Sequence, residues 1–304
     1  MRSSSSFFAV LALLCLTIAP ATPAETFRLE PYKDDLFRYP APIASEFGGA
    51  YVTVPFDHQR DVVARDEIPD EKTRPEYVSL DVKTSEADLL LRRDSEVVRY
   101  VGVGRTDGDA KVVVIFLHGL GASRLDGAND WRSGGNLNRI KNLMVRNDGV
   151  YLSADYAATR RKAKRQIAAL IDAVAETSPE APIFLICASI GARVCWDLAE
   201  DPTTAARLDG LLMIAAIGHP GFADSAVVRD PTRWIPIYMA HGNRDRNVSW
   251  RPQDRLFKEI KSVAPDYPIR FALFDTGTHR APLRMTDWRL AINWMLEVRA
   301  SRNP

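Results

Sequence analysis

Apolar and polar positions follow a repeating strand–helix pattern from about residue 77 onward. Residues 111–119 (KVVVIFLHG) form a continuous apolar run that ends in a turn, which is typical of a strand buried on both faces. Residues 149–156 predict the next strand, and residues 159–177 predict an amphipathic helix. Its apolar side chains recur at the spacing that places them on one face: Ile167, Leu170, Ile171 and Val174.

The same unit recurs through the rest of the chain. Further strands are predicted at residues 77–83, 97–103, 181–187, 208–218, 235–242 and 269–275. Further helices are predicted at residues 190–201 and 286–301. Strands that alternate with helices imply an α/β fold with a doubly wound, mostly parallel sheet flanked by helices. We assign this sheet to one domain over residues 76–304.

The N-terminus has a different pattern. Arg2 precedes an apolar run at 7–19 that is shorter than the ~20 residues needed to span a bilayer, and small residues follow it. Residues 1–24 are therefore interpreted as a secretory signal peptide, cleaved after Ala21 or Ala24. This predicts a periplasmic or secreted protein with no integral membrane association after cleavage. An uncleaved membrane anchor is the alternative.

Composition adds two expectations. Residues 25–75 are rich in Pro and charged residues and predict an irregular N-terminal extension. Removing the signal peptide removes one Arg and no acid, so 40 basic against 39 acidic residues becomes 39 against 39. This neutral balance gives no reason to expect nucleic acid as a partner, and the cationic run at 159–166 is interpreted as a solvated helix face.

Two cysteines lie outside the signal peptide, at Cys187 and Cys195. If most of the intervening segment is helical, about six residues at ~1.5 Å each separate the two Cα atoms by roughly 9 Å. That distance exceeds the ~7 Å limit for a disulfide. We therefore expect two buried thiols that act as small apolar side chains.

Candidate catalytic residues stand just past the ends of different predicted strands. Ser189 follows the strand at 181–187, Asp245 follows the strand at 235–242, and His279 follows the last strand. Ligands bind at the carboxyl ends of the strands in a parallel sheet. Ser, then Asp, then His is the chain order of the triad in α/β-hydrolases.

The sequence resembles the α/β-hydrolase family over roughly residues 77–298. FLHGLGAS at 116–123 is similar to the opening motif of the carboxylesterase and acyl-protein thioesterase branch. The resemblance implies the α/β-hydrolase fold, and it places the second oxyanion donor at the backbone N–H of Leu120, with Gly119 as the alternative. At position 187, where the family usually has Gly, this chain has Cys, which is also small.

The expected chemistry follows from the residue types. A serine hydroxyl is a weak nucleophile unless a base removes its proton, so His279 would act on Ser189 while Asp245 orients the imidazole. The Ile190 N–H, at the start of the following helix, would be the first oxyanion donor. Taken alone, each residue has a simpler interpretation. Ser189 would belong to an ordinary strand-to-helix turn, Asp245 would cap a helix, and His279 would be a loop histidine.

The surroundings of the site give weaker predictions. Only about 16 residues separate the strands at 208–218 and 235–242, which is too short for a large lid. The polar segment at 124–143 would suit a rim for a sugar ester or a small anionic acyl group, or it is an ordinary solvated loop. Other rim candidates are Trp131, Trp250 and Arg280. Of the other histidines, His118 and His241 are interpreted as loop-shaping residues, and His219 as either a pocket residue or a loop residue.

These patterns together predict a serine hydrolase that cleaves small-molecule carboxylic esters through an acyl-enzyme. No His or Cys pair has metal-ligand spacing and no glycine-rich phosphate loop follows a strand, so neither a metal nor a cofactor is expected. A thioesterase, peptidase or acyltransferase would use the same triad. A non-catalytic binding protein on a hydrolase scaffold is the remaining alternative.

Overall fold

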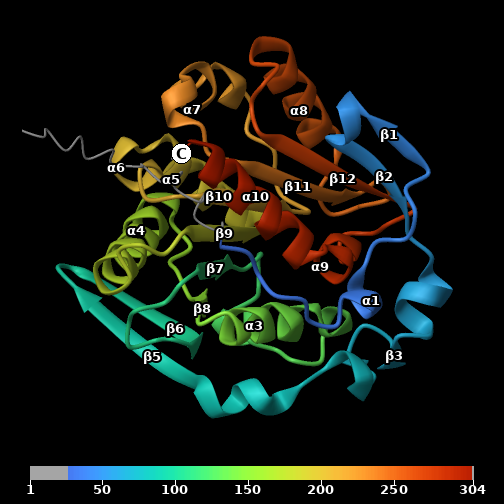
Figure 1. Ribbon diagram of the computed structural model, residues 1–304, viewed down its shortest axis with the longest axis horizontal. Coiled ribbons are helices and arrows are strands. Elements are labelled where there is room, and N and C mark those ends of the chain that lie inside the picture. The colour runs from blue at the N-terminus through green and yellow to red at the C-terminus, as the bar shows by residue number, and fades with distance from the viewer. Residues whose placement is uncertain (1–26, 303–304) are drawn as a thin grey trace, which may run out of the picture.

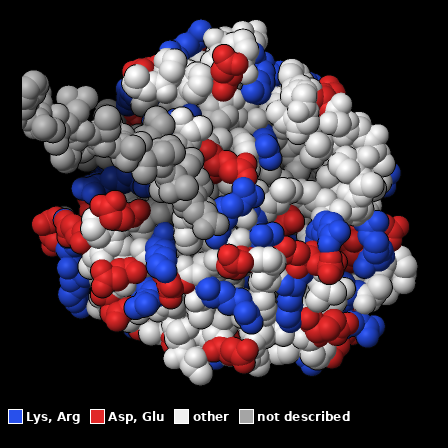
Figure 2. All heavy atoms as spheres, in the orientation of Figure 1, with Lys and Arg blue, Asp and Glu red and all other residues white. Residues whose placement is uncertain are grey.

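The computed structural model describes residues 27–302. The predicted signal peptide at 1–24 lies outside these residues. Within them, no helix combines the length and the apolar character needed to cross a bilayer. Acidic and basic side chains are interspersed on the face shown in Figure 2.

One large mixed sheet forms the centre of the molecule, with the strand order β1-β2-β12-β11-β10-β9-β7-β8-β6-β5 (Figure 1). Its neighbouring strands from β8 to β2 pair in parallel. The predicted parallel strands are β7 (Val113–Leu117), β8 (Val150–Ala154), β9 (Ile183–Ala188), β10 (Gly210–Ile214), β11 (Ile237–Gly242) and β12 (Ile269–Asp275). The doubly wound, mostly parallel sheet is confirmed.

Helices cover both faces of this sheet because its central strands are apolar on both sides. In β7, Val113 and Ile115 belong to one core, whereas Val114 and Phe116 belong to the other. The first core packs against α4 (Arg160–Thr177), α5 (Ala192–Glu200) and α8 (Arg251–Val263). The second core packs against α3 (Asn136–Arg146), α9 (Ala281–Met285) and α10 (Trp288–Arg302), and α3 and α10 cross the sheet in Figure 1.

The remaining connections are short. Between β10 and β11 the chain forms only η7 (Phe222–Asp224), α7 (Ala226–Arg229) and η8 (Pro231–Arg233), so no large lid is built there. Other short helices are α1 (Asp34–Phe37), α2 (Arg124–Gly127) and α6 (Pro202–Ala205). The prediction of a fold without a large lid is confirmed for this connection.

The N-terminal segment differs from the irregular extension that the sequence predicts. β1 (Ala44–Glu46) and β2 (Tyr51–Pro55) form an antiparallel pair, and β2 joins the main sheet beside β12. A separate hairpin is made by β3 (Asp66–Ile68) and β4 (Lys72–Thr73). The YVTVP sequence of β2 is β-branched and apolar, but Gly before it and Pro within it hide the strand pattern.

The prediction of a strand at residues 77–83 is wrong. This stretch forms the 3₁₀ turns η3 (Pro75–Tyr77) and η4 (Leu80–Ser85). The Asn138 side chain of α3 accepts a hydrogen bond from the Ser79 N–H at 2.9 Å and donates one to the Ser79 carbonyl at 2.8 Å, so this backbone is held by a helix instead of a strand. The edge hairpin of β5 (Glu86–Arg93) and β6 (Glu96–Gly104) follows it.

The cysteine prediction is also wrong, because Cys187 and Cys195 form a disulfide with a Cα–Cα distance of 6.4 Å. The estimate of roughly 9 Å assumed a helical rise along the intervening residues. In the structure the chain reverses sharply at Ser189, whose φ is +52°. α5 therefore folds back beside β9 and brings the two cysteines together.

Candidate active site

Ser189 occupies a strained turn between β9 and α5. A positive φ is unfavourable for a residue with a Cβ, at a cost of order 1–3 kcal/mol, and persists only where the surroundings enforce it. Gly191 shows how close those surroundings are, because a Cβ there would lie 2.7 Å from the His118 carbonyl oxygen and 2.8 Å from that of Leu117. The turn therefore requires the small residue that the sequence places two positions after the serine.

Asp245 and His279 form a hydrogen-bonded pair. His279 Nδ1 lies 2.6 Å from Asp245 Oδ2, and the Asp245 side chain is fully buried. Asp245 Oδ1 accepts the backbone N–H groups of Asn247 at 2.8 Å and Val248 at 3.0 Å. Asp245 lies in the loop after β11, and His279 lies between β12 and α9, so adjacent parallel strands bring the two together.

Burial by itself would raise the pKa of Asp245. Hydrogen bonds from His241, the Val248 N–H, His279 and the Asn247 N–H outweigh this effect and hold the pKa well below its usual range. The carboxylate is therefore ionised at neutral pH. It can orient the His279 ring and stabilise its protonated form.

Ser189 and His279 line one cavity of about 380 Å³. The pair with Asp245 uses Nδ1 of His279, so Nε2 is the nitrogen available to the serine. Among the hydrogen bonds of residues 27–302 none joins Ser189 to His279. Such bonds are often long in unliganded enzymes and shorten when substrate binds.

The cavity has an apolar interior and a charged rim. Its apolar lining comes from Phe116, Ala122, Leu137, Ala188, Ile214, Ala215 and Leu283. Its charged lining comes from Asp70, Glu71, Asp126, Arg132 and Arg280. Arg280 was expected at the rim from the sequence, and Arg132 belongs to the predicted polar segment at 124–143. Trp131 and Trp250 are not among the residues that line it.

Asp70 and Glu71 reach the cavity from the β3–β4 hairpin, which sequence reasoning missed. Arg284 of α9 anchors this hairpin: its two terminal nitrogens contact Asp66 at 3.0 and 2.6 Å, and Nη2 also contacts Asp70 at 3.1 Å. The Arg284 and Asp66 side chains are each only 1% exposed. No local pattern near residue 70 signals this long-range contact.

The candidate oxyanion loop lies against the serine. A Cβ on Gly119 would be 3.1 Å from Ser189 Cβ. Leu120 and Ile190 both line a second cavity of about 330 Å³ on this side of the site. Within the part of the chain that the structure describes, the Leu120 N–H donates no backbone hydrogen bond, so it is available to a ligand.

The other histidines have separate roles. His118 Nδ1 lies 2.9 Å from the Gly119 carbonyl oxygen, in keeping with a loop-shaping role. His219 contacts the Pro220 carbonyl at 3.0 Å and lines neither cavity. His241 contacts Asp245 itself, which sequence reasoning missed.

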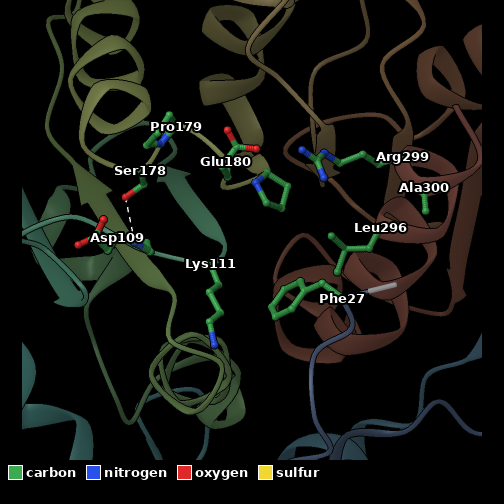
Figure 3. Close-up of a pocket in the computed structure, with 11 residues that line it drawn as sticks. Phe27, Asp109, Lys111, Ser178, Pro179, Glu180, Leu296, Arg299 and Ala300 are labelled. Carbon is green, nitrogen blue, oxygen red and sulfur yellow. Dashed lines mark hydrogen bonds between the residues drawn. The ribbon is translucent and has the colours of Figure 1, made fainter. Parts of the chain in front are cut away.

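A third cavity, of about 470 Å³, lies at the opposite end of the parallel strands, where β7 and β9 begin (Figure 3). Its serine, Ser178, accepts a hydrogen bond from the Ala110 N–H, drawn as the dashed line. Its cations Lys111 and Arg299 are paired with acids outside the cavity lining. It therefore lacks the arrangement of nucleophile and base found around Ser189.

A parallel sheet with helices on both faces, a serine on a strand-to-helix turn and a His–Asp pair at neighbouring strand ends define the class: the chain has the α/β-hydrolase fold. No protein-family model and no curated protein matches the sequence. Among solved structures it is similar to an esterase of Pyrococcus furiosus, with a TM-score of 0.54, 13% identity, and coverage of 77% of this chain and 96% of that chain. It is also similar to a thermostable esterase, with a TM-score of 0.54, 16% identity, and coverage of 71% of this chain and 64% of that chain.

Proposed function

We propose that the protein is a serine hydrolase that cleaves carboxylic esters of small or polar acyl groups through an acyl-enzyme. The observation that carries this proposal is the convergence of three residues. Ser189 sits on a left-handed turn and shares a cavity with His279, which is hydrogen-bonded to the buried, ionised Asp245. The similarity to esterase structures agrees with this assignment.

In the proposed mechanism, Ser189 Oγ attacks the ester carbonyl while His279 Nε2 accepts its proton. Asp245 stabilises the imidazolium that forms. The N–H groups of Leu120 and Ile190 donate to the oxyanion, and each such donor typically contributes on the order of 3 kcal/mol. His279 then protonates the departing alcohol, and a water molecule attacks the acyl-enzyme with His279 again as the base. The bond between the acyl carbon and Ser189 Oγ breaks, the carboxylic acid leaves, and His279 returns the proton to Ser189 Oγ.

The cavity supports a short acyl group. Its volume of about 380 Å³ is near the low end of the ~300–1,000 Å³ range of ligand sites. The apolar interior suits a short carbon chain, and the rim of acids and arginines suits hydroxyl groups, so a sugar ester is a candidate substrate. A short-chain preference predicts that nitrophenyl acetate and butyrate are cleaved faster than the decanoate ester.

The test combines a covalent label with turnover. A fluorophosphonate probe should label the folded protein at Ser189, as peptide mapping would show. Ser189→Ala should abolish labelling and lower nitrophenyl acetate hydrolysis by at least about 10³-fold. Circular dichroism controls for folding. Hydrolysis by Ser189→Ala at the wild-type rate would refute the proposal, and folded wild-type protein that takes up no label would favour the binding-protein alternative.

The acyl acceptor is a separate question. A thioesterase, a peptidase and an acyltransferase share the same acyl-enzyme and differ in the bond cleaved or in the group that accepts the acyl unit. Matched ester, thioester and amide substrates, together with competing alcohols, separate these activities. The proposal predicts that oxygen esters with water as acceptor give the highest kcat/KM.

We further propose that the protein works in the periplasm or outside the cell. Disulfides persist in oxidising compartments, so the Cys187–Cys195 bond supports this location, together with the signal-like pattern at 1–24. N-terminal sequencing of exported protein should begin at Thr22 or Glu25. Recovery of all the protein from the cytosol with an intact N-terminus would contradict the location.

A further inference from the structure

His241 is a buried titratable group that the proposed mechanism does not use. It lies at the end of β11 and is 0% exposed. Its Nδ1 lies 2.7 Å from Gln253 Oε1 of α8. Its Nε2 lies 3.1 Å from Asp245 Oδ2 and 3.0 Å from the Val248 carbonyl oxygen. Both ring nitrogens are therefore engaged, and one contacts the carboxylate of the triad.

The hydrogen-bonding capacity of its partners fixes the proton on Nε2. An ionised carboxylate and a backbone carbonyl only accept hydrogen bonds, so Nε2 must carry a proton and donate it. Nδ1 faces a side-chain amide, which can present either oxygen or nitrogen. The Gln253 amide is buried, and either of its orientations leaves the Nε2 donor to Asp245 in place.

The bond from His241 reaches the same oxygen that His279 uses. Asp245 Oδ2 accepts from His241 at 3.1 Å and contacts His279 at 2.6 Å, while Oδ1 is held by two backbone N–H groups. These four donors hold the carboxylate in place, with Oδ2 directed to His279. The hydrogen bond from His241 also offsets part of the negative charge of Asp245, which would otherwise act on His279 alone.

Other charged groups lie near this pair: Arg244 and Arg246 flank Asp245 in the chain, and both are exposed. In the part of the chain that the structure describes, no Arg or Lys forms an ion pair with Asp245. α8 presents the neutral Gln253, and the Asp254 carboxylate on that helix is engaged by Lys258. On β12, Asp275 accepts a hydrogen bond from Asn243. Arg280 lies beside His279 in the chain and is exposed.

We propose that His241 is a positioning residue for the triad: it fixes the Asp245 carboxylate and limits how strongly that carboxylate stabilises protonated His279. The kinetic consequence of this inference rests on the proposed function. The hydrogen bond between His241 and Asp245, on which the inference is based, does not depend on turnover. Removing the donor leaves more of the Asp245 charge to His279. The His279 ring should then hold its proton to higher pH, and less of it is available as a base near neutrality.

Two amide variants give a matched test. His241→Gln ends near the position of Nε2 and keeps a donor to Asp245, whereas His241→Asn ends near Nδ1 and does not reach it. In His241→Asn the acidic limb of kcat/KM for nitrophenyl acetate should move up by roughly 0.5 to 1 pH unit, which lowers kcat/KM by about three- to tenfold on the limb itself and by less above it. His241→Gln should restore the position of the limb.

The second readout does not require turnover. In a Ser189→Ala background, ¹⁵N-NMR titration of His279 should show the same upward shift in His241→Asn and its reversal in His241→Gln. If the His279 titration shifts in this way but the wild-type protein hydrolyses no ester, the positioning role stands and the proposed function is wrong. If His241→Asn loses activity while the limb and the His279 titration stay unchanged, His241 only fills space and the inference is wrong.

Discussion

The disulfide at the serine turn allows a quantitative prediction. Cys187 and Cys195 are separated by eight positions, so the bond closes a short loop. In the chain-entropy relation, closing a loop of this length destabilises the unfolded state by about 2.5 kcal/mol at 25 °C. The double variant Cys187→Ala/Cys195→Ala should therefore lose about 2.5 kcal/mol of unfolding free energy in urea, measured without reductant.

The same variant should remain active. The positive φ of Ser189 is enforced by the close packing of Gly191 against the carbonyl groups of His118 and Leu117, which the substitutions leave in place. Ester hydrolysis at 25 °C should stay within about threefold of wild type, because this packing holds the serine turn without the disulfide. The wild-type protein unfolded with a phosphine reductant should resemble the variant, and the variant itself should be insensitive to reductant. Equal unfolding free energies for oxidised wild type and variant would refute the loop-closure reasoning.

The other predictions concern Asp245, the carboxylate of the proposed triad, and the β3–β4 hairpin that lines the cavity. Asp245→Asn should lower kcat by about 10⁴-fold. Because the pKa of Asp245 is lowered in the fold, its ionised form stabilises the protein above about pH 4, and this stability is lost as the pH falls through the lowered pKa. Urea unfolding of Asp245→Asn should therefore vary less with pH below about pH 4 than that of wild type, and equal slopes would contradict this. Arg284→Leu leaves the buried Asp66 carboxylate without its partner and should cost about 3 to 5 kcal/mol, with a raised KM because the hairpin lines the cavity. An unchanged melting temperature and KM would show that the ion pair is dispensable.

The sequence predicts the central sheet well because its signals are local. Strands such as β7 and β9 are short, continuous apolar runs, which are typical of strands buried on both faces. The Asp245–His279 contact also follows from local signals, since each residue stands just past a strand and parallel strands end at one edge of the sheet.

The failures involve tertiary contacts and backbone geometry. β2 is short, follows Gly48 and Gly49 and ends in Pro55, so only its pairing with β1 and β12 identifies it as a strand. The disulfide depends on one positive φ at Ser189, which no composition rule reveals. The contact of His241 with Asp245 could have been suspected because Asp245 follows His241 by four positions, just past the end of β11, but the carboxylate acceptor is visible only in three dimensions.

The position of β2 has a consequence for constructing shorter forms of the protein. A fragment starting at residue 76 contains the serine, aspartate and histidine, yet it lacks the strand that pairs with β12 from Phe271 to Asp275. The backbone groups on that side of β12 would then be open to pairing with another molecule, and such open edges promote aggregation. Insolubility of the shortened chain would therefore report a missing neighbour for β12, even with every proposed catalytic group present.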